Sequence, residues 1–281
     1  IVGDSPIPGN PDFESASGYS KLKEFRSLLT FPAKRVRLKK GKFLKSVALS
    51  GVKYDKVISV PLMKTHVQAL VTLSLKNMMG LVPGRAKHEL HKKGLHQSIA
   101  DLNTAVKPDI ALIDATWCME GNGPIGGTAK KMDLLIASTD PVAADTVGTI
   151  VMGIDPMQVR HIVACEEAEL GTMDFEVVGE KIDAVASEFN LPFTYKSGPN
   201  ILIGKAREFF ASRVHVITDR LAKVTVNHDL CTLCRACIAT CPEDAISVKD
   251  GKLHIDTNKC VRCLCCIEAC PESALRYSGI L

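Results

Sequence analysis

The chain has 281 residues, of which 46% are hydrophobic and 23% charged, and its formal net charge is +4 at pH 7. These values are typical of an α/β globular protein and exclude the fibrous and disordered classes. The mild charge and 5% aromatic content give no case for nucleic-acid binding, and no apolar run reaches the roughly eighteen residues of a membrane span.

Taken in chain order, strand-like and helix-like segments alternate over residues 1–190. The expected strands are 56–60 (KVISV), 109–114 (DIALID), 132–137 (MDLLIA) and 175–179 (FEVVG). The expected helices are 95–106, 141–152 and 156–170, with Asp140 and Asp155 as N-caps before prolines. The pattern predicts an α/β fold with a mostly parallel sheet covered by helices on both faces.

Composition divides the rest of the chain. The turn-rich stretch 190–200 closes the α/β domain, and residues 191–222 are expected to be a linker with a connecting helix over 204–221. Residues 223–281 form a cysteine-rich module with an internal repeat, too small in each half to bury a core without a metal group.

Nine of the eleven cysteines fall between positions 231 and 270. Such clustering argues for metal in a reducing, cytoplasmic compartment and against a disulfide framework. Each repeat reads C-x-x-C-x-x-C-x-x-x-C-P, in which the fourth cysteine ligates the other cluster. One 4Fe–4S cluster is therefore expected on Cys231, Cys234, Cys237 and Cys270, and a second on Cys260, Cys263, Cys266 and Cys241.

Zinc is the alternative for thiolate ligands, although zinc ribbons use two CxxC pairs and no CP dipeptide. Cys265 is the extra thiol, and we expect it to be a small packed residue rather than a ligand. The last fifty or so residues resemble bacterial-type ferredoxins. The resemblance implies a small α+β fold of paired hairpins and helices that exchanges single electrons with a donor or acceptor protein.

A set of motifs marks the larger domain. They are GDSP at 3–6, VPLMKTH at 60–66, TLSLKNMMGLVPG at 72–84, the histidine-bearing stretch 87–96, EGNGPIGG at 120–127 and DPVAAD at 140–145. As a set they resemble the uncharacterised iron–sulfur centre proteins called domain of unknown function 362, over about residues 2–180. The strand and helix that precede GDSP in that family are missing and the chain does not begin with Met, so we expect the N-terminus to be incomplete.

The strand ending at Pro61 leads into Lys64 and His66. Because ligands bind at the carboxyl ends of parallel strands, these two residues are candidates to bind a small acidic substrate, with His66 able to transfer protons. Lys76 and Asn77 follow on a helix and complete the predicted catalytic set. An alternative for His66 is a histidine satisfied by hydrogen bonds within a loop.

Two further segments carry candidate ligand contacts. Gly121, Gly123 and Gly126 lie in a glycine-rich loop that would let a cofactor approach the backbone, although no nucleotide-binding motif is complete. The HELH stretch at 88–91 lacks the histidine spacing of a zinc protease. Its lysines favour a mobile basic loop over an acidic substrate, with a solvated surface loop as the alternative.

Three functions fit these features. The first is a redox enzyme that delivers electrons from two 4Fe–4S clusters to a small acidic substrate in the α/β domain. The second is a non-catalytic electron-carrier or adaptor subunit whose α/β domain docks a partner protein. The third has structural or sensory clusters beside non-redox chemistry.

Overall fold

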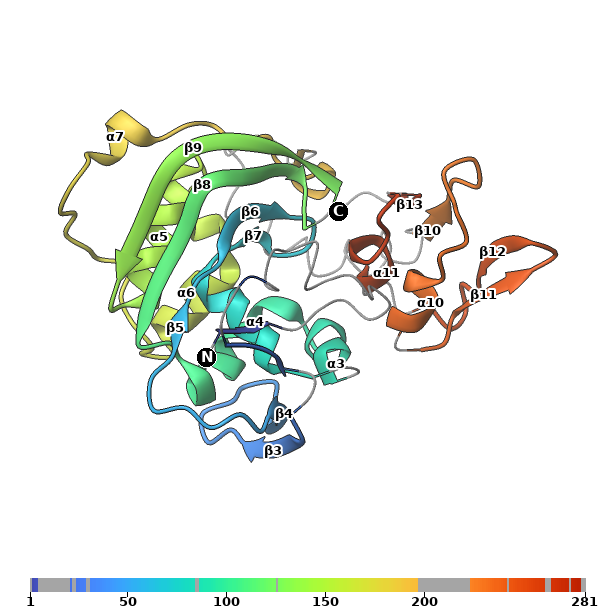
Figure 1. Ribbon diagram of the computed structural model, residues 1–281, viewed down its shortest axis with the longest axis horizontal. Coiled ribbons are helices and arrows are strands. Elements are labelled where there is room, and N and C mark those ends of the chain that lie inside the picture. The colour runs from blue at the N-terminus through green and yellow to red at the C-terminus, as the bar shows by residue number, and fades with distance from the viewer. Residues whose placement is uncertain are drawn as a thin grey trace, which may run out of the picture.

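The structure is a computed structural model that describes residues 2–4, 21, 24–28, 31–83, 86–124, 126–196, 223–241, 243–260, 264–272 and 274–278. Its main sheet contains β5 (Ile58–Ser59), β6 (Leu62–His66), β7 (Leu70–Thr72), β8 (Ile110–Asn122) and β9 (Gly126–Ser138) (Figure 1). β8 pairs in parallel with β5 and β6 on one side and antiparallel with β9 on the other. β7 joins β6 in antiparallel fashion.

Pro61 divides what is otherwise one continuous strand into β5 and β6. Proline has no N–H for the ladder, but its carbonyl still accepts a hydrogen bond of 2.9 Å from the Asp114 N–H on β8. The second piece, β6, keeps this register at Leu62, opposite Asp114, and the pairing then shifts at an irregularity so that Lys64 lies opposite Met119. Its last residue, His66, lies at the start of the turn into β7.

Helices pack against one face of this sheet. The longer ones are α3 (Ala86–Lys92), α4 (Leu95–Val106), α5 (Pro141–Val151) and α6 (Arg160–Glu167), and α5 and α6 lie inside the curve of the β8–β9 hairpin in Figure 1. Shorter elements are α2 (Ser74–Asn77), η3 (Met78–Leu81), η4 (Pro156–Gln158), α7 (Ile182–Val185) and α8 (Phe193–Lys196). Ala111 and Ile113 of β8 point into the core and are fully buried, whereas Ile110 is 39% exposed.

The α/β class is confirmed, and the parallel arrangement holds for β5, β6 and β8. The sheet as a whole is mixed, because the 132–137 run belongs to β9 and returns antiparallel along β8. A hairpin leaves no crossover helix to cover the second face. In the described ranges Ile58 and Leu135 on that face are more than half exposed, so the expected second layer of helices is not seen there.

The predicted helices 95–106 and 141–152 are confirmed almost to the residue, and Asp140 caps α5 through the N–H groups of Val142 and Ala143. The predicted helix 156–170 is broken at Val159 into η4 and α6. The predicted strand 175–179 is wrong: that segment has no strand partner, and Val178 is 94% exposed.

Two small strand pairs precede the main sheet. β1 (Val2–Asp4) runs parallel to β2 (Phe25–Ser27), and β3 (Ala33–Arg37) runs antiparallel to β4 (Ser46–Ser50). The β3–β4 loop is held by the buried carboxylate of Asp101 on α4, which accepts hydrogen bonds from the N–H groups of Lys42, Phe43 and Leu44 at 2.7–2.9 Å.

The cysteine-rich module contains β10 (Lys223–Val226), α10 (Ala236–Thr240), β11 (Ile246–Lys249), β12 (Lys252–Ile255), α11 (Cys265–Glu268) and β13 (Leu275–Ser278). β10 pairs with β13 and β11 with β12, both antiparallel. These small sheets are consistent with the expected α+β module. The predicted connecting helix at 204–221 lies outside the described residues.

Asp145, on α5, fixes helix α2 in place. Its carboxylate accepts the Ser74 N–H at 2.7 Å and the Leu75 N–H at 2.9 Å, and the preceding residue Leu73 offers no side-chain cap. A buried acid from a distant helix thus satisfies the first N–H groups of α2. Burial raises the pKa of Asp145 to about 8, against the lowering effect of the two N–H donors.

We expect Asp145→Asn to flatten the pH dependence of stability. The folded pKa of about 8 lies above the ordinary value of 3.8, so the folded state holds the proton more tightly. The wild-type free energy of unfolding should therefore fall as pH rises from about 4 to 8. Urea unfolding followed by the fluorescence of Trp117, the single tryptophan, measures it. A variant that loses stability with pH as steeply as the wild type would contradict the assignment.

Candidate functional site

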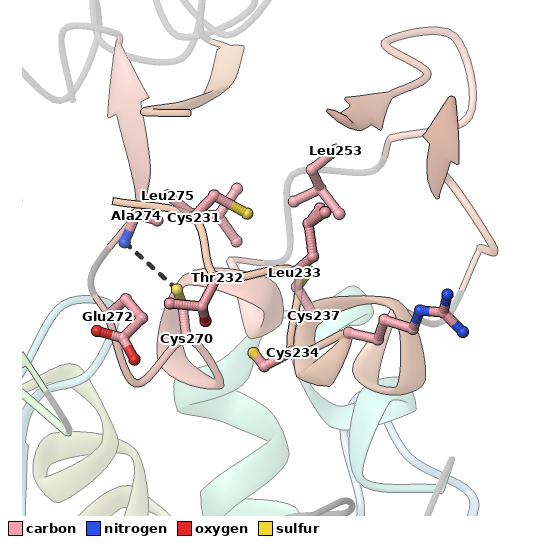
Figure 2. A pocket seen from close by; sticks show the side chains of 11 residues that line it. Cys231, Thr232, Leu233, Cys234, Cys237, Leu253, Cys270, Glu272, Ala274 and Leu275 are labelled. Atoms are coloured by element: carbon pink, nitrogen blue, oxygen red, sulfur yellow. Dashed lines mark hydrogen bonds between the residues drawn. The ribbon is translucent and has the colours of Figure 1, made fainter. Parts of the chain in front are cut away.

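Four cysteines from both repeats surround one pocket in the C-terminal module. Figure 2 shows Cys231, Cys234 and Cys237 from the first repeat together with Cys270, which follows α11 in the second. These four are the set predicted for one cluster from the crossed ligand pattern. Apolar side chains such as Leu253 and Leu275 line the rest of the pocket together with Thr232, Arg235 and Glu272.

The backbone around these cysteines is arranged to bind thiolates. The Ala274 N–H donates to the Cys270 Sγ at 3.3 Å, and in the other repeat the Ala245 N–H donates to the Cys241 Sγ at 3.2 Å. N–H groups that donate to cluster sulfurs are one means of setting a cluster's potential. Arg235 and Leu264 occupy equivalent left-handed positions at the starts of α10 and α11. Such conformations form concave backbone sites at iron–sulfur centres.

The placement of the thiols can be compared with the geometry of a single-ion site. Thiolates around a single zinc lie about 2.3 Å from it, and within the described ranges no group of three or more His, Cys, Asp or Glu side chains is placed to hold one metal ion. Burial, together with the charges of Cys270, Cys234 and Cys231, raises the pKa of Cys237 to about 11. Four thiolates are therefore stable here only with a cationic group between them, and the donor set fits a 4Fe–4S cluster.

The second predicted ligand set is described in part. Cys241, Cys260 and Cys266 are located, whereas Cys263 lies outside the described residues. Cys265 is buried at the start of α11, as is its neighbour Cys266. No disulfide joins any two of the ten described cysteines.

In the α/β domain, three of the four predicted catalytic residues meet at the end of β6. His66 is fully buried, while Lys64 on β6 and Lys76 on α2 are half-buried. Burial lowers the pKa of His66 well below its ordinary value, and the charges of Lys76, His91, Lys64 and His161 lower it further. His66 is therefore a neutral imidazole at pH 7, next to two lysines that can attract an anion.

The turn between β6 and β7 organises this cluster. The His66 Nδ1 accepts hydrogen bonds from the N–H groups of Gln68 and Ala69, both at 3.1 Å. The Gln68 Oε1 lies 2.7 Å from the His91 Nδ1, and the Gln68 carbonyl accepts the Tyr195 hydroxyl at 2.8 Å. Hydrogen bonds within the loop thus occupy the Nδ1 of His66, which agrees with the alternative interpretation of this histidine given above. They also fix the direction of the Nε2.

Asn77 lies apart from this trio in its hydrogen bonding. Its side chain is exposed, and its amide donates to the Ser59 Oγ on β5 at 3.1 Å. That bond ties α2 to the sheet and so helps to position Lys76.

The predicted glycine-rich loop forms the turn of the β8–β9 hairpin and packs against β6. The Thr65 Oγ1 donates to the Gly121 carbonyl at 2.7 Å, and a Cβ on Gly123 would lie 2.0 Å from the Thr65 carbonyl oxygen. Gly126 begins β9 and is exposed. Close packing of backbone on backbone therefore accounts for Gly123 without a ligand.

The HELH stretch is helical rather than a loop. Residues 86–92 form α3, where the i to i+3 periodicity turns His91 toward Gln68. The prediction of a loop, which was based on the lysine content, is therefore wrong for this segment. The side chain of His88 lies outside the described residues.

His161 on α6 is a member of the cluster that the sequence did not reveal. It is fully buried, and its Nδ1 lies 3.2 Å from the Nδ1 of His96 on α4. The two rings are stacked, with centroids 5.4 Å apart. No short motif surrounds His161. Because His161 is far from His66 in the sequence, no local pattern could have predicted that the two residues belong to one cluster.

We expect Gly123→Ala to destabilise the fold by about 1–3 kcal/mol, because the new methyl group overlaps the Thr65 carbonyl and displaces the end of β6. Gly80→Ala is the matched control, since a Cβ there meets no atom within 4 Å. Thermal unfolding followed by Trp117 fluorescence compares them. Equal melting temperatures for the two variants would show that the contact is not tight.

Comparison with known proteins gives two family matches and one relative. A family described as domain of unknown function (DUF362) matches residues 1–150, and one described as a 4Fe-4S dicluster domain matches residues 223–271. The thylakoid-associated protein sll1697 of Synechocystis is 28% identical over 185 residues, which cover 60% of this chain and 58% of that protein. The chain thus spans less than two thirds of the relative's length. No solved structure matches.

Residues 223–271 are therefore an iron–sulfur domain of the electron-transfer type. No helix in the described part of the chain combines the length and apolarity needed to cross a bilayer. Residues 1–150 make up more than half of the 281 in the sequence. The chain belongs to the DUF362 family and carries a C-terminal 4Fe-4S dicluster domain.

Proposed function

We propose that this chain is an iron–sulfur oxidoreductase that binds two 4Fe–4S clusters through its C-terminal module and a small acidic substrate at the end of β6. The observation that carries the proposal is the meeting of Lys64, His66 and Lys76 around a buried strand end. Such a strand end is where open α/β sheets bind ligands. When bound, the clusters supply one-electron transfer.

The chain's own residues have separable tasks in this proposal. Lys64 and Lys76 attract the anionic group of the substrate and orient it. His66 remains neutral and holds its ring in a fixed direction through the hydrogen bonds at Nδ1. Thr194 and Tyr195 bond to the carbonyls of Val67 and Gln68, at 2.6 and 2.8 Å, and so hold the turn beneath α8. An electron-donor protein is the expected partner.

Anaerobic reconstitution should give about eight irons per chain, because each of two 4Fe–4S clusters contributes four. Cys270→Ser should bring the count to about four by removing the ligand that the second repeat lends to the first pocket. Cys265→Ser is the matched control, a neighbouring buried cysteine outside the ligand pattern, and should keep the full count. Eight irons in Cys270→Ser, or stoichiometric zinc in the wild type, would overturn the two-cluster proposal.

We expect Lys64→Gln and Lys76→Gln each to slow the reoxidation of the reduced protein by its acidic substrate at least tenfold, with iron content unchanged. Each variant loses a charge that attracts the substrate, while Lys181→Gln, an exposed lysine elsewhere, should react normally. Stopped-flow absorbance with a panel of small carboxylic acids measures the rates. Equal rates in all variants would remove the proposed substrate site. Reoxidation by a partner protein alone would instead establish an electron carrier.

A further inference from the structure

Positive charge is concentrated in the β3–β4 hairpin. Residues 34–45 contain seven lysines and arginines, and residues 31–54 contain no aspartate or glutamate. All seven cations are exposed: Lys34, Arg35, Arg37, Lys39, Lys40, Lys42 and Lys45. Together with Phe43, which is 53% exposed, they are called here the basic hairpin surface. Concentrated charge beside exposed apolar area is a feature of interaction surfaces.

The pairing of the two strands turns part of this charge outward. Val36 on β3 packs against the core, opposite the buried Val47 on β4. Because side chains alternate along a strand, Arg35 and Arg37 lie on the other face of the hairpin, away from the core. In Figure 1 this hairpin lies at the lower edge of the molecule, away from the turn between β8 and β9.

The loop between the strands is held firmly, so its exposed side chains have defined positions. Leu38 and Leu44 are buried at its two ends, and the Leu38 N–H donates to the Lys45 carbonyl at 3.0 Å. The Asp101 carboxylate accepts three of the loop's N–H groups from below. One edge of the Phe43 ring lies over the backbone of Gly94, where an added Cβ would be 3.0 Å away.

Neighbouring acids neutralise only a small part of this charge. Lys40 pairs with Glu169 and Lys42 with Glu167, both at 3.1 Å, and all four side chains are more than half exposed. Such exposed pairs contribute little and are screened by salt. Within the described ranges the other five cations have no acidic partner: Lys34, Arg35, Arg37, Lys39 and Lys45.

We propose that the basic hairpin surface docks the protein on an anionic phospholipid membrane, with Phe43 at the level of the lipid headgroups. Clusters of Lys and Arg are attracted to anionic lipid surfaces, and an apolar side chain among them enters the headgroup boundary. Five of the seven cations are lysines, which attract phosphate as point charges without the bidentate geometry that arginine gives to specific recognition. The inference is independent of the proposed substrate site.

Flotation of the reconstituted holoprotein with lipid vesicles tests the proposal. Vesicles with about one third phosphatidylserine should bind on the order of a thousandfold more tightly than pure phosphatidylcholine, because each of five unpaired cations contributes about fivefold. Raising the salt from about 0.1 M to about 1 M should release the protein, since the Debye length falls from about 10 Å to about 3 Å. Equal binding to both kinds of vesicle overturns the inference.

A triple variant locates the binding surface. Arg35→Gln, Arg37→Gln and Lys39→Gln together should weaken binding to the anionic vesicles about a hundredfold, with iron content unchanged. The matched control removes the same charge from three exposed lysines elsewhere: Lys181, Lys249 and Lys252. The control variant should bind as the wild type does. An equal loss of affinity in the two triple variants shows an effect of net charge alone and overturns the inference.

A fluorescent probe in the loop separates a lipid surface from another polyanion. Phe43→Trp in a Trp117→Phe background leaves one tryptophan, whose emission should shift to the blue on anionic vesicles and be quenched by brominated acyl chains. Unquenched emission from the bound protein shows that residue 43 stays outside the bilayer and overturns the inference. Tighter binding of the wild type to polyglutamate or single-stranded RNA than to anionic vesicles assigns the surface to a macromolecular partner and overturns it as well.

Discussion

The hydrogen bonds from the Gln68 and Ala69 N–H groups to the His66 Nδ1 are the constraint on which the α/β site depends. They make a histidine side chain the internal support of a tight turn, so the ring cannot rotate and its Nε2 has one direction. The same turn brings Leu70 into a left-handed conformation, with φ of 65°, although the residue is fully buried. Such backbone strain is retained where the surrounding structure compensates for it, and it clusters at functional sites.

Two buried carboxylates, Asp101 and Asp145, and the partly buried Asp140 hold the surrounding segments. Asp145 supports the first turn of α2 and hence Lys76, while Asp101 supports the loop between β3 and β4. Asp140 caps α5 and also accepts the Thr172 N–H at 3.0 Å. Asp145 and Asp101 satisfy backbone donors that would otherwise be buried without partners, which costs more than the bond itself contributes. The site is therefore positioned by side-chain-to-backbone bonds as much as by the sheet.

Local features of the molecule could be predicted from the sequence. The cysteine spacing predicted that Cys270 of the second repeat joins Cys231, Cys234 and Cys237, and these four line one pocket. The Asp-Pro pairs gave the starts of α5 and η4. Pairing direction could not be read from apolar runs, so β9 was expected to be parallel. The glycine-rich stretch 120–127 between the two apolar runs could have indicated a hairpin with a longer loop.

The remaining differences between the sequence-based predictions and the structure arise from contacts between residues that are far apart in the chain. Lys64, His66 and Lys76 are near one another in sequence, and the strand-end rule located them. His161 reaches the same place only because α6 packs against α4, which no local pattern encodes. Asn77 shares a four-residue helix with Lys76 but is turned toward Ser59, since neighbouring residues on a helix face different directions.

The central claim is that the histidine cluster and the iron–sulfur module serve one reaction. An anaerobic crystal structure of the reconstituted protein, with iron located by anomalous scattering, tests it most directly. The account predicts two cubanes, one of them on Cys231, Cys234, Cys237 and Cys270. It also predicts that one cubane lies no farther from the His66 ring than about the diameter of one helix, roughly 10–12 Å. A zinc ion in the pocket, or cubanes separated from His66 by the whole α/β core, would contradict it.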